Sequence, residues 1–154
     1  MSLHYLIDGY NVIRSTEQME TGKLQEQRER LLRFIEERAP CGRNRVTVVF
    51  DGKPGRDWNG WRGATGVIFS EDRDADTEIK ERVDGMGNPS QAVVVTNDRA
   101  IQKWVKGAGA RVVEVAEFLR AGANPTTPRA PLSEKPGADE QKRITDDLRR
   151  IWKD

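Results

Sequence analysis

Residues 4–11 of the chain read HYLIDGYN, a short apolar strand that runs directly into an aspartate and a turn. Four further segments repeat the continuous apolar run, and they are rich in β-branched residues. Strands that are apolar throughout are typical of a parallel sheet covered on both faces. The four runs are RVTVVF at 45–50, GVIF at 66–69, QAVVVT at 91–96 and RVVEV at 111–115.

The segments between these runs have helical character. Leu24, Leu31 and Ile35 fall at helical spacing between charged residues, which predicts an amphipathic helix over 23–39 that ends before Pro40. Alternating strands and helices indicate an α/β fold: a Rossmann-like three-layer domain with a mostly parallel five-stranded sheet. Shorter helices are predicted at 75–84, 99–106 and 116–121, and an exposed loop rich in Gly, Trp and charge at 52–65.

The chain shows no internal repeat and reads as one domain over residues 1–121. Residues 122–138 hold four prolines and are expected to form a linker. Residues 139–154 are expected to form a C-terminal helix with Ile144, Leu148 and Ile151 on one stripe. That stripe fits either docking on the domain or binding a partner, and we favour docking.

The composition excludes several kinds of site. The chain has 154 residues, 36% hydrophobic and 33% charged, with one cysteine, Cys41, and one histidine, His4. A Cys/His zinc site and an internal disulfide are therefore excluded, as is a Ser-His-Asp triad unless His4 serves it. Any metal must have oxygen ligands, which favours Mg²⁺ or Mn²⁺. We expect no membrane span and no signal peptide, and hence a cytoplasmic location.

Aspartates gather at the predicted strand ends. Asp8 ends the first strand, Asp51 follows the second, and Asp98 lies shortly after the fourth. Asp76 opens the helix after the third strand. In an open parallel sheet, ligands bind outside the carboxyl ends of the strands, where the strand order reverses. Carboxylates gathered there repel one another unless a cation such as Mg²⁺ or Mn²⁺ compensates their charge.

Each of these residues also has a simpler interpretation. A single aspartate after a strand often caps the next helix or starts a turn. Asp51 is the most turn-like of the four, and Asp8 is the least, because we expect the helix after it to start later. Asn11 and Asn97 could orient a carboxylate or serve as turn residues, and Thr96 could donate to a phosphate oxygen or simply favour the strand.

Several motifs in order resemble one known family, the YacP-like branch of the NYN domains within the PIN-like nuclease superfamily. The resemblance extends over residues 3–121, and nothing is carried over to the tail. The matching motifs are LIDGYNVI at 6–13, VFDG at 49–52, ADTEI at 75–79, VVTND at 94–98 and GAGA at 107–110 with EFL at 117–119.

The resemblance implies a metal-dependent endoribonuclease that cleaves RNA with metal-activated water. It implies Asp8, Asp76 and Asp98 as the metal-binding carboxylates. The segment DRDAD also offers Asp72 and Asp74 as rivals to Asp76, which we prefer because it opens a helix with a buried apolar side. The supporting catalytic residues implied by the family are Asn11, Asn97 and Asp51.

A carboxylate site repels phosphate, so cations must bring the RNA to it. The net charge of +1 neither demands nor forbids nucleic acid, and each of the 26 Lys and Arg residues could be solvated surface. Trp58 and Trp61 lie among basic residues in the loop at 53–63, where they could stack on single-stranded bases or pack over the sheet edge. The candidate RNA-binding cations are Arg14, Arg28, Arg33, Arg73, Lys80 and Arg99.

Single-stranded or loop RNA is the expected substrate, and the sequence leaves ribosome association open. The main competing function is a non-catalytic RNA-binding module on the same fold. A receiver-type phosphorylation domain would need a lysine after the fifth strand, and the sequence has none there. A haloacid-type phosphatase would need a second aspartate at the position of Tyr10.

Overall fold

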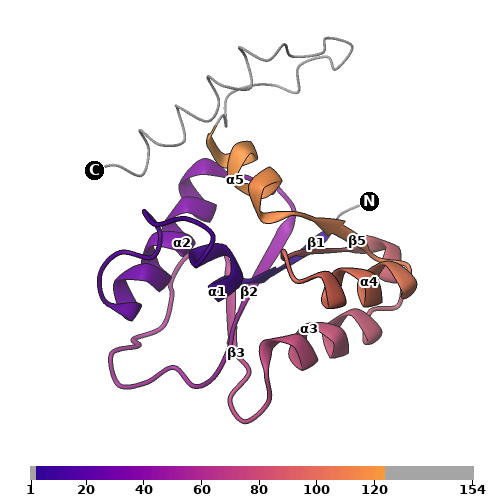
Figure 1. The fold of residues 1–154 in the computed structure, drawn as a ribbon, viewed down its shortest axis with the longest axis horizontal. Helices are drawn as coiled ribbons and strands as arrows, with labels where there is room; N and C mark the ends of the chain where they lie inside the picture. The colour runs from indigo at the N-terminus through magenta and orange to yellow at the C-terminus, as the bar shows by residue number, and fades with distance from the viewer. Residues whose placement is uncertain (1–2, 124–154) are drawn as a thin grey trace.

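The computed structural model describes residues 3–123, which form a five-stranded sheet with helices on both faces (Figure 1). The predicted C-terminal helix, and the predicted linker from residue 124 onward, lie outside the described residues. Every apolar run in the sequence contains a strand, although the fifth strand ends at Val113 and Val115 already begins the helix that follows it. The strands are β1 (His4–Asp8), β2 (Arg45–Phe50), β3 (Gly66–Phe69), β4 (Ala92–Val95) and β5 (Arg111–Val113).

The strands lie in the order β3-β2-β1-β4-β5, and all four neighbouring pairs are parallel. The chain first builds the sheet outward from β1 through β2 and β3, then returns to the other side of β1 for β4 and β5. Ile7 of β1 lies in register with Val48 of β2 and Val95 of β4. The strand order therefore reverses between β1 and β4, and Asp8 ends β1 at that point.

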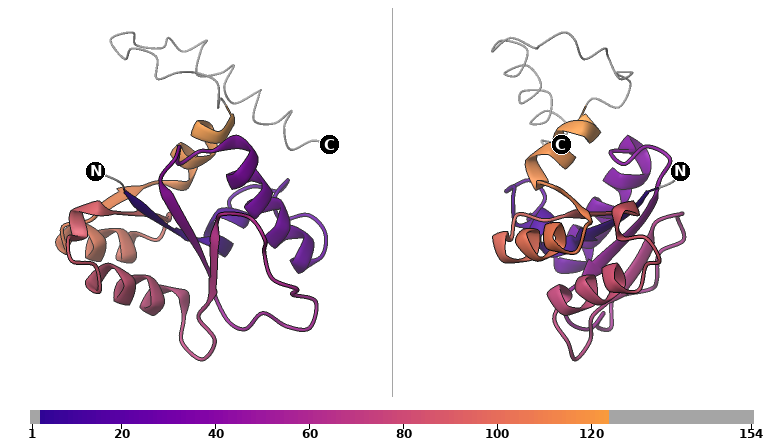
Figure 2. Two further views of the ribbon diagram at one scale, coloured as in Figure 1. Left: turned by 180° about the vertical axis from the view of Figure 1, so that it is seen from behind. Right: turned by 90° about the vertical axis from the view of Figure 1, so that its right-hand side faces the viewer.

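Helices cover both faces of the sheet, which confirms the predicted three-layer α/β fold. On one face α1, α2 and α5 pack with Ile7 and Val48, and on the other α3 and α4 pack with Leu6 and Val49. Figure 2 shows the two layers from behind and from the side. Within residues 3–123, no helix is both long and apolar enough to cross a bilayer. The helices are α1 (Gly9–Ile13), α2 (Leu24–Arg38), α3 (Ala75–Asp84), α4 (Arg99–Gly107) and α5 (Val115–Ala123), with a 3₁₀ turn at Pro89–Gln91.

The first helix starts earlier than the sequence led us to expect. It begins at Gly9, directly after Asp8. A Cβ on Gly9 would lie 2.4 Å from the ring of Phe50, so the glycine is what lets the chain turn this tightly against the sheet. Asp8 occupies the N-cap position, yet its side chain makes no capping hydrogen bond. Its carboxylate is thus left for other interactions.

The last described helix is longer than predicted. α5 continues through Ala123, so the first two residues of the expected linker are helical. Gly122 is buried there, and a Cβ at this position would lie 2.1 Å from the ring of Phe34 on α2. The close approach of α5 to α2 explains why the helix persists into a glycine-containing segment.

Candidate functional site

Asp8 and the segment after β4 meet at the carboxyl edge of the sheet. Because Ile7 pairs with Val95, the next residues of the two strands, Asp8 and Thr96, come together. The Thr96 hydroxyl donates to Asp8 Oδ2 at 3.5 Å and accepts from the backbone N–H of Asp98 at 3.1 Å. Thr96 is fully buried and bridges the two aspartates. A role as phosphate donor is not open to it in this arrangement.

The electrostatics of Asp8 reflect its crowded position. Burial raises the pKa of Asp8 to about 6. The backbone N–H of Asn11 and the Thr96 hydroxyl lower the pKa of Asp8, while the negative charges of Asp76 and Asp98 raise it further. The three carboxylates therefore sense one another across the switch point, as expected from their placement at the strand ends.

Asp76 has one oxygen that lacks a partner. Its Oδ1 is buried and makes no hydrogen bond, while its Oδ2 lies 3.8 Å from the Lys80 ammonium one turn along α3. Burial raises the pKa of Asp76, against the lowering effect of Lys80, and the charges of Asp98 and Asp74 add to the rise. A buried carboxylate oxygen without a donor is costly, and a cation would relieve that cost.

Asp98 has two roles at once. Its Oδ1 accepts from the backbone N–H groups of Ala100 and Ile101 at 2.9 and 3.2 Å, which caps α4. The simple capping interpretation thus holds for this oxygen. No hydrogen bond to its Oδ2 occurs among residues 3–123, so one oxygen remains available to a ligand.

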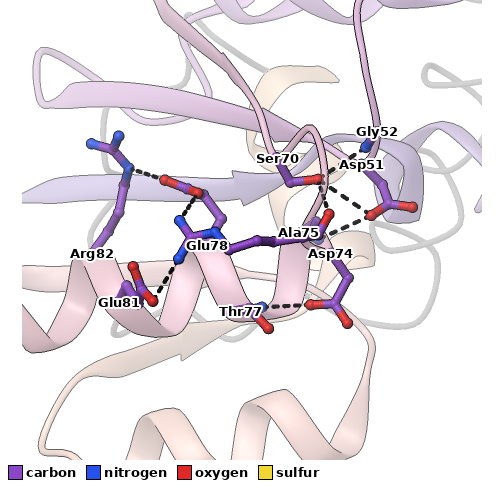
Figure 3. A network of polar contacts seen from close by, with 10 residues as sticks. Asp51, Gly52, Ser70, Asp74, Ala75, Thr77, Glu78, Glu81 and Arg82 are labelled. Atoms are coloured by element: carbon purple, nitrogen blue, oxygen red, sulfur yellow. Dashed lines mark hydrogen bonds and ion pairs between the residues drawn. The ribbon is translucent and has the colours of Figure 1, made fainter.

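The acids around α3 separate into distinct roles, as Figure 3 shows. Asp51 Oδ1 accepts from the Ala75 N–H at 3.0 Å and from the Ser70 hydroxyl at 3.5 Å, so it fixes the start of the helix that carries Asp76. Asp74 caps α3 through the Thr77 N–H at 2.9 Å. Asp74 is thus engaged in capping, whereas Asp76 has a free buried oxygen.

Asp72, the other rival, lies away from this arrangement. Its side chain is 90% exposed and pairs with Lys53 at 3.7 Å. Of the three acids of the DRDAD segment, only Asp76 has a buried oxygen without a hydrogen-bond partner within residues 3–123.

The two asparagines bind backbone groups. Asn11 Oδ1 accepts from the Asn97 N–H at 2.7 Å, and Asn97 Oδ1 accepts from the Val115 N–H at 3.0 Å. Together they connect α1, the segment after β4 and the start of α5. Their amide oxygens are occupied, so they position the loops around the carboxylates.

The structure separates the candidate cations by burial and pairing. Arg28 is only 4% exposed, and its guanidinium donates to the Tyr10 hydroxyl at 3.0 Å and the Pro54 carbonyl at 2.7 Å. It also lies over the rings of Phe69 and Trp58, with its Cζ 5.0 and 6.0 Å from their centroids. Arg28 is thus a core residue that ties loop 51–65 to α1, and its burial excludes it as a surface phosphate ligand in this arrangement.

Two further candidates are engaged by acids. Arg73 pairs with Glu78 and Glu81 on α3 (the cluster drawn in Figure 3), and Arg33 lies 3.9 Å from Glu29. In all three pairs the arginine side chain is 41% or more exposed, so the pairs contribute little to stability. Their charge is locally compensated, which weakens the case for either as a phosphate ligand.

The remaining candidate cations are not buried, and each lies close in the chain to a candidate site residue. Lys80 pairs with Asp76 and sits 5.7 Å from the centre of the Trp104 ring. Arg14 lies 5.6 Å from the centre of the Tyr10 ring, one turn after Asn11. Arg99 is exposed beside Asp98 and makes no ion pair within residues 3–123.

The tryptophans pack over the sheet edge. Trp58 meets Phe69 of the edge strand β3 edge-on at 5.2 Å, and the Trp61 indole N–H donates to Glu36 at 3.3 Å. Both are partly buried against the core. Of the two interpretations that the sequence left open, packing matches this arrangement.

Comparison with known proteins agrees with the fold. The model of the family described as the YacP-like NYN domain matches residues 5–151. The chain belongs to this family. Members of the YacP-like NYN family have nuclease-type functions related to RNA, so RNA is the substrate that family membership implies.

Similarity to two solved structures agrees with this family membership. The chain is similar to the crystal structure of Rae1 (YacP) from Bacillus subtilis, with 27% identity and a TM-score of 0.67 over 98% of this chain and 82% of that one. A mutant of the same protein, with one tryptophan replaced by leucine, gives 28% identity and a TM-score of 0.66 over 96% of each chain. No curated protein matches the chain.

The oxygen donors of this NYN domain fit a divalent cation held by one or two carboxylates. Among residues 3–123, no three acidic, histidine or cysteine side chains lie close enough together to hold one ion. Mg²⁺ usually takes one or two carboxylates and completes its shell with waters and substrate phosphate. The partnerless oxygen of Asp76, the raised pKa of Asp8 and the available oxygen of Asp98 fit a site of that kind.

Two exposed lysines of this NYN domain escaped the sequence analysis. Lys103 and Lys106 follow Arg99 at i+4 and i+7, so they share the outer face of α4, and no ion pair engages them within residues 3–123. The signal that could have found them is a helix that carries three cations and no acid, beginning at a catalytic candidate.

Proposed function

We propose that this NYN domain is a metal-dependent endoribonuclease that cleaves single-stranded or loop RNA by water activated in the cluster of Asp8, Asp76 and Asp98. One observation carries the proposal: the buried Oδ1 of Asp76 has no hydrogen-bond partner within residues 3–123, although it lies in a carboxylate whose charge raises the pKa of Asp8. Repulsion between carboxylates destabilises the folded chain. A bound cation would compensate their negative charge, as expected for a member of a nuclease family.

The residues of the cluster have separable tasks. One or two of the carboxylates of Asp8, Asp76 and Asp98 would hold Mg²⁺ or Mn²⁺, and waters and substrate phosphate would complete the shell of the ion. The ion supplies Lewis-acid stabilisation of the phosphoryl oxygens and lowers the pKa of water. Thr96 holds Asp8 and Asp98 side by side through its hydroxyl group. Asp51 fixes the start of α3 and thereby the position of Asp76.

The RNA strand would approach along unpaired cations. Arg99, Lys103 and Lys106 form an exposed line that leads away from Asp98 along α4. Positive charge of this kind attracts the backbone and offsets the repulsion from the carboxylates. Lys80, beside Asp76, could release its carboxylate and turn to a phosphate when a metal ion binds.

One observation favours a second candidate function. The absence of a tight three-acid arrangement within residues 3–123 is also what a non-catalytic RNA-binding module would show. The two functions differ in what the carboxylates do. A binding module holds RNA equally well, or better, when Asp8 is replaced by asparagine, because the change removes a negative charge.

The test is cleavage of a mixed RNA pool, including structured and ribosome-bound RNAs, with Mg²⁺ or Mn²⁺ and mapping of the new ends. We expect wild-type protein to cut within single-stranded or loop segments, and EDTA to abolish cutting. Asp98→Asn should abolish it as well, with Asp57→Asn, a change in the exposed loop, as the matched control. Intact RNA with the purified wild type would reject the nuclease proposal.

A further inference from the structure

A pocket of about 280 Å³ opens at the same edge of the sheet, between the end of α1 and the start of α5. Its walls include Ser15 and Thr16 after α1, and Val115, Leu119 and Arg120 on α5. The roles derived above for the carboxylates and their supporting residues leave this pocket unused.

The pocket adjoins the carboxylate cluster through one shared residue. Asn97 lines it and lies between Thr96 and Asp98 in the chain. The Asn97 side chain is held by the Val115 N–H, and its backbone N–H is held by Asn11. The pocket is therefore fixed relative to the carboxylates from two sides.

The lining has the chemistry that a nucleobase requires. Val115 and Leu119 are 1% and 3% exposed and form an apolar floor. The Ser15 hydroxyl donates to the Val12 carbonyl at 2.6 Å and so can still accept, and the Thr16 hydroxyl accepts from the Met19 N–H at 3.1 Å and so can still donate. Arg120 is exposed and makes no ion pair among residues 3–123, so its planar guanidinium can stack on a ring or reach a phosphate. Small-molecule sites commonly combine an apolar floor with a few polar groups at the rim.

We propose that this pocket binds one nucleobase of the RNA, that of a nucleotide next to the scissile phosphate. The inference rests on the proposed function, because it takes the phosphate to lie at Asp8, Asp76 and Asp98. A base splayed from a single strand lies beside its own phosphate, and a pocket that shares Asn97 with the cluster is placed to receive it. The pocket would thus favour unpaired over paired RNA.

The α5 surface offers a matched pair of variants. Ala116 is exposed and lines the pocket, so Ala116→Leu places extra bulk there without entering the core. Ala121 is exposed on the same helix and does not line the pocket, so Ala121→Leu is the control. Both changes put one good helix former in place of another. Arg120→Gln removes the guanidinium while keeping a polar side chain.

The experiment is an NMR titration of the full chain with the four nucleoside 5′-monophosphates and with ribose 5-phosphate, which lacks the base. We expect saturable shifts of the Val115, Ala116 and Arg120 amides with at least one nucleotide, and binding of ribose 5-phosphate roughly fivefold or more weaker. Ala116→Leu should lose this preference and Ala121→Leu should keep it. Arg120→Gln should weaken nucleotide binding.

Three results would overturn the inference: no shifts at these amides, equal binding of ribose 5-phosphate, or unchanged nucleotide binding by Ala116→Leu. The titration needs no cleavage, so its failure is distinguishable from failure of the nuclease proposal, which is decided by the RNA pool. In that cleavage assay we expect Ala116→Leu to raise KM, while the metal dependence stays that of the wild type.

Discussion

At the scale of the residue, Asp8 is held in a state that favours its neutral form. Its pKa in the folded protein, about 6, lies above its ordinary value of 3.8. The resulting stability is fully present below pH 3.8, where both states are protonated, and is lost as the pH rises through about 6. Asp8→Asn should therefore raise the free energy of unfolding at pH 7.5 by about 1–3 kcal/mol.

Thermal unfolding in EDTA at pH 7.5 and at lower pH checks this prediction. The gain from Asp8→Asn should shrink as the pH falls from 6 toward 4. Asp72→Asn, at a side chain that is 90% exposed, should change little at any pH. A destabilised Asp8→Asn variant at pH 7.5 would mean that the ionised Asp8 carboxylate does not destabilise the folded protein as we infer.

Arg28 gives the second residue-scale prediction. Arg28→Ala removes the contacts to the Tyr10 hydroxyl and the Pro54 carbonyl and leaves a cavity between the aromatic rings. We expect a loss of about 2–4 kcal/mol in the free energy of unfolding, measured by urea denaturation. Arg33→Ala, at a side chain that is 59% exposed, should stay within about 0.5 kcal/mol of wild type. Equal stability of the two variants would contradict a core role for Arg28.

At the scale of the element, α4 makes a prediction about salt. If Lys103 and Lys106 contact phosphates, each change to alanine should reduce the slope of log affinity against log salt by about 0.7 for single-stranded RNA. Arg43→Ala is the control, because Arg43 is exposed near the start of β2 and away from the carboxyl ends of the strands. Fluorescence anisotropy at several salt concentrations measures the slope. Equal slopes for all three variants would contradict a contact between α4 and the RNA phosphates.

The short helix α1 gives the second prediction at this scale. Gly9→Ala would put a methyl group 2.4 Å from the buried Phe50 ring and 3.0 Å from Val48, so something must shift. We expect the free energy of unfolding to fall by about 1–3 kcal/mol. Because Asp8 precedes Gly9, we also expect weaker metal binding. Gly87→Ala, with open space around its Cβ, should leave both unchanged. A Gly9→Ala variant with wild-type melting temperature would refute this packing argument.

At the scale of the whole molecule, the sequence predicted the parallel sheet and the placement of Asp8 and Asp98 after neighbouring strands at one edge of it. It did so because buried parallel strands are apolar throughout, and because a parallel topology brings strand ends such as Asp8 and Asp98 together. The preference for Asp76 came from a helix start that the sequence shows directly.

Other features depended on contacts that sequence spacing does not encode. Arg28 looks like any other of the 26 cations until Phe69 and Trp58 are folded around it. The early start of α1 depends on the closeness of Phe50 to Gly9, residues far apart in the chain. The pocket beside Asn97 arises only when α1 and α5 lie together.

The central claim is that the carboxylates at the switch point hold a divalent cation for RNA cleavage. Its most direct test is single-turnover cleavage of a single-stranded RNA, titrated with Mn²⁺, by wild type, Asp76→Asn and the control Asp72→Asn. We predict saturable Mn²⁺ dependence for wild type and control, and for Asp76→Asn a loss of apparent Mn²⁺ affinity or rate of roughly a hundredfold or more. Cleavage by Asp76→Asn with the Mn²⁺ dependence of the wild type would contradict the claim.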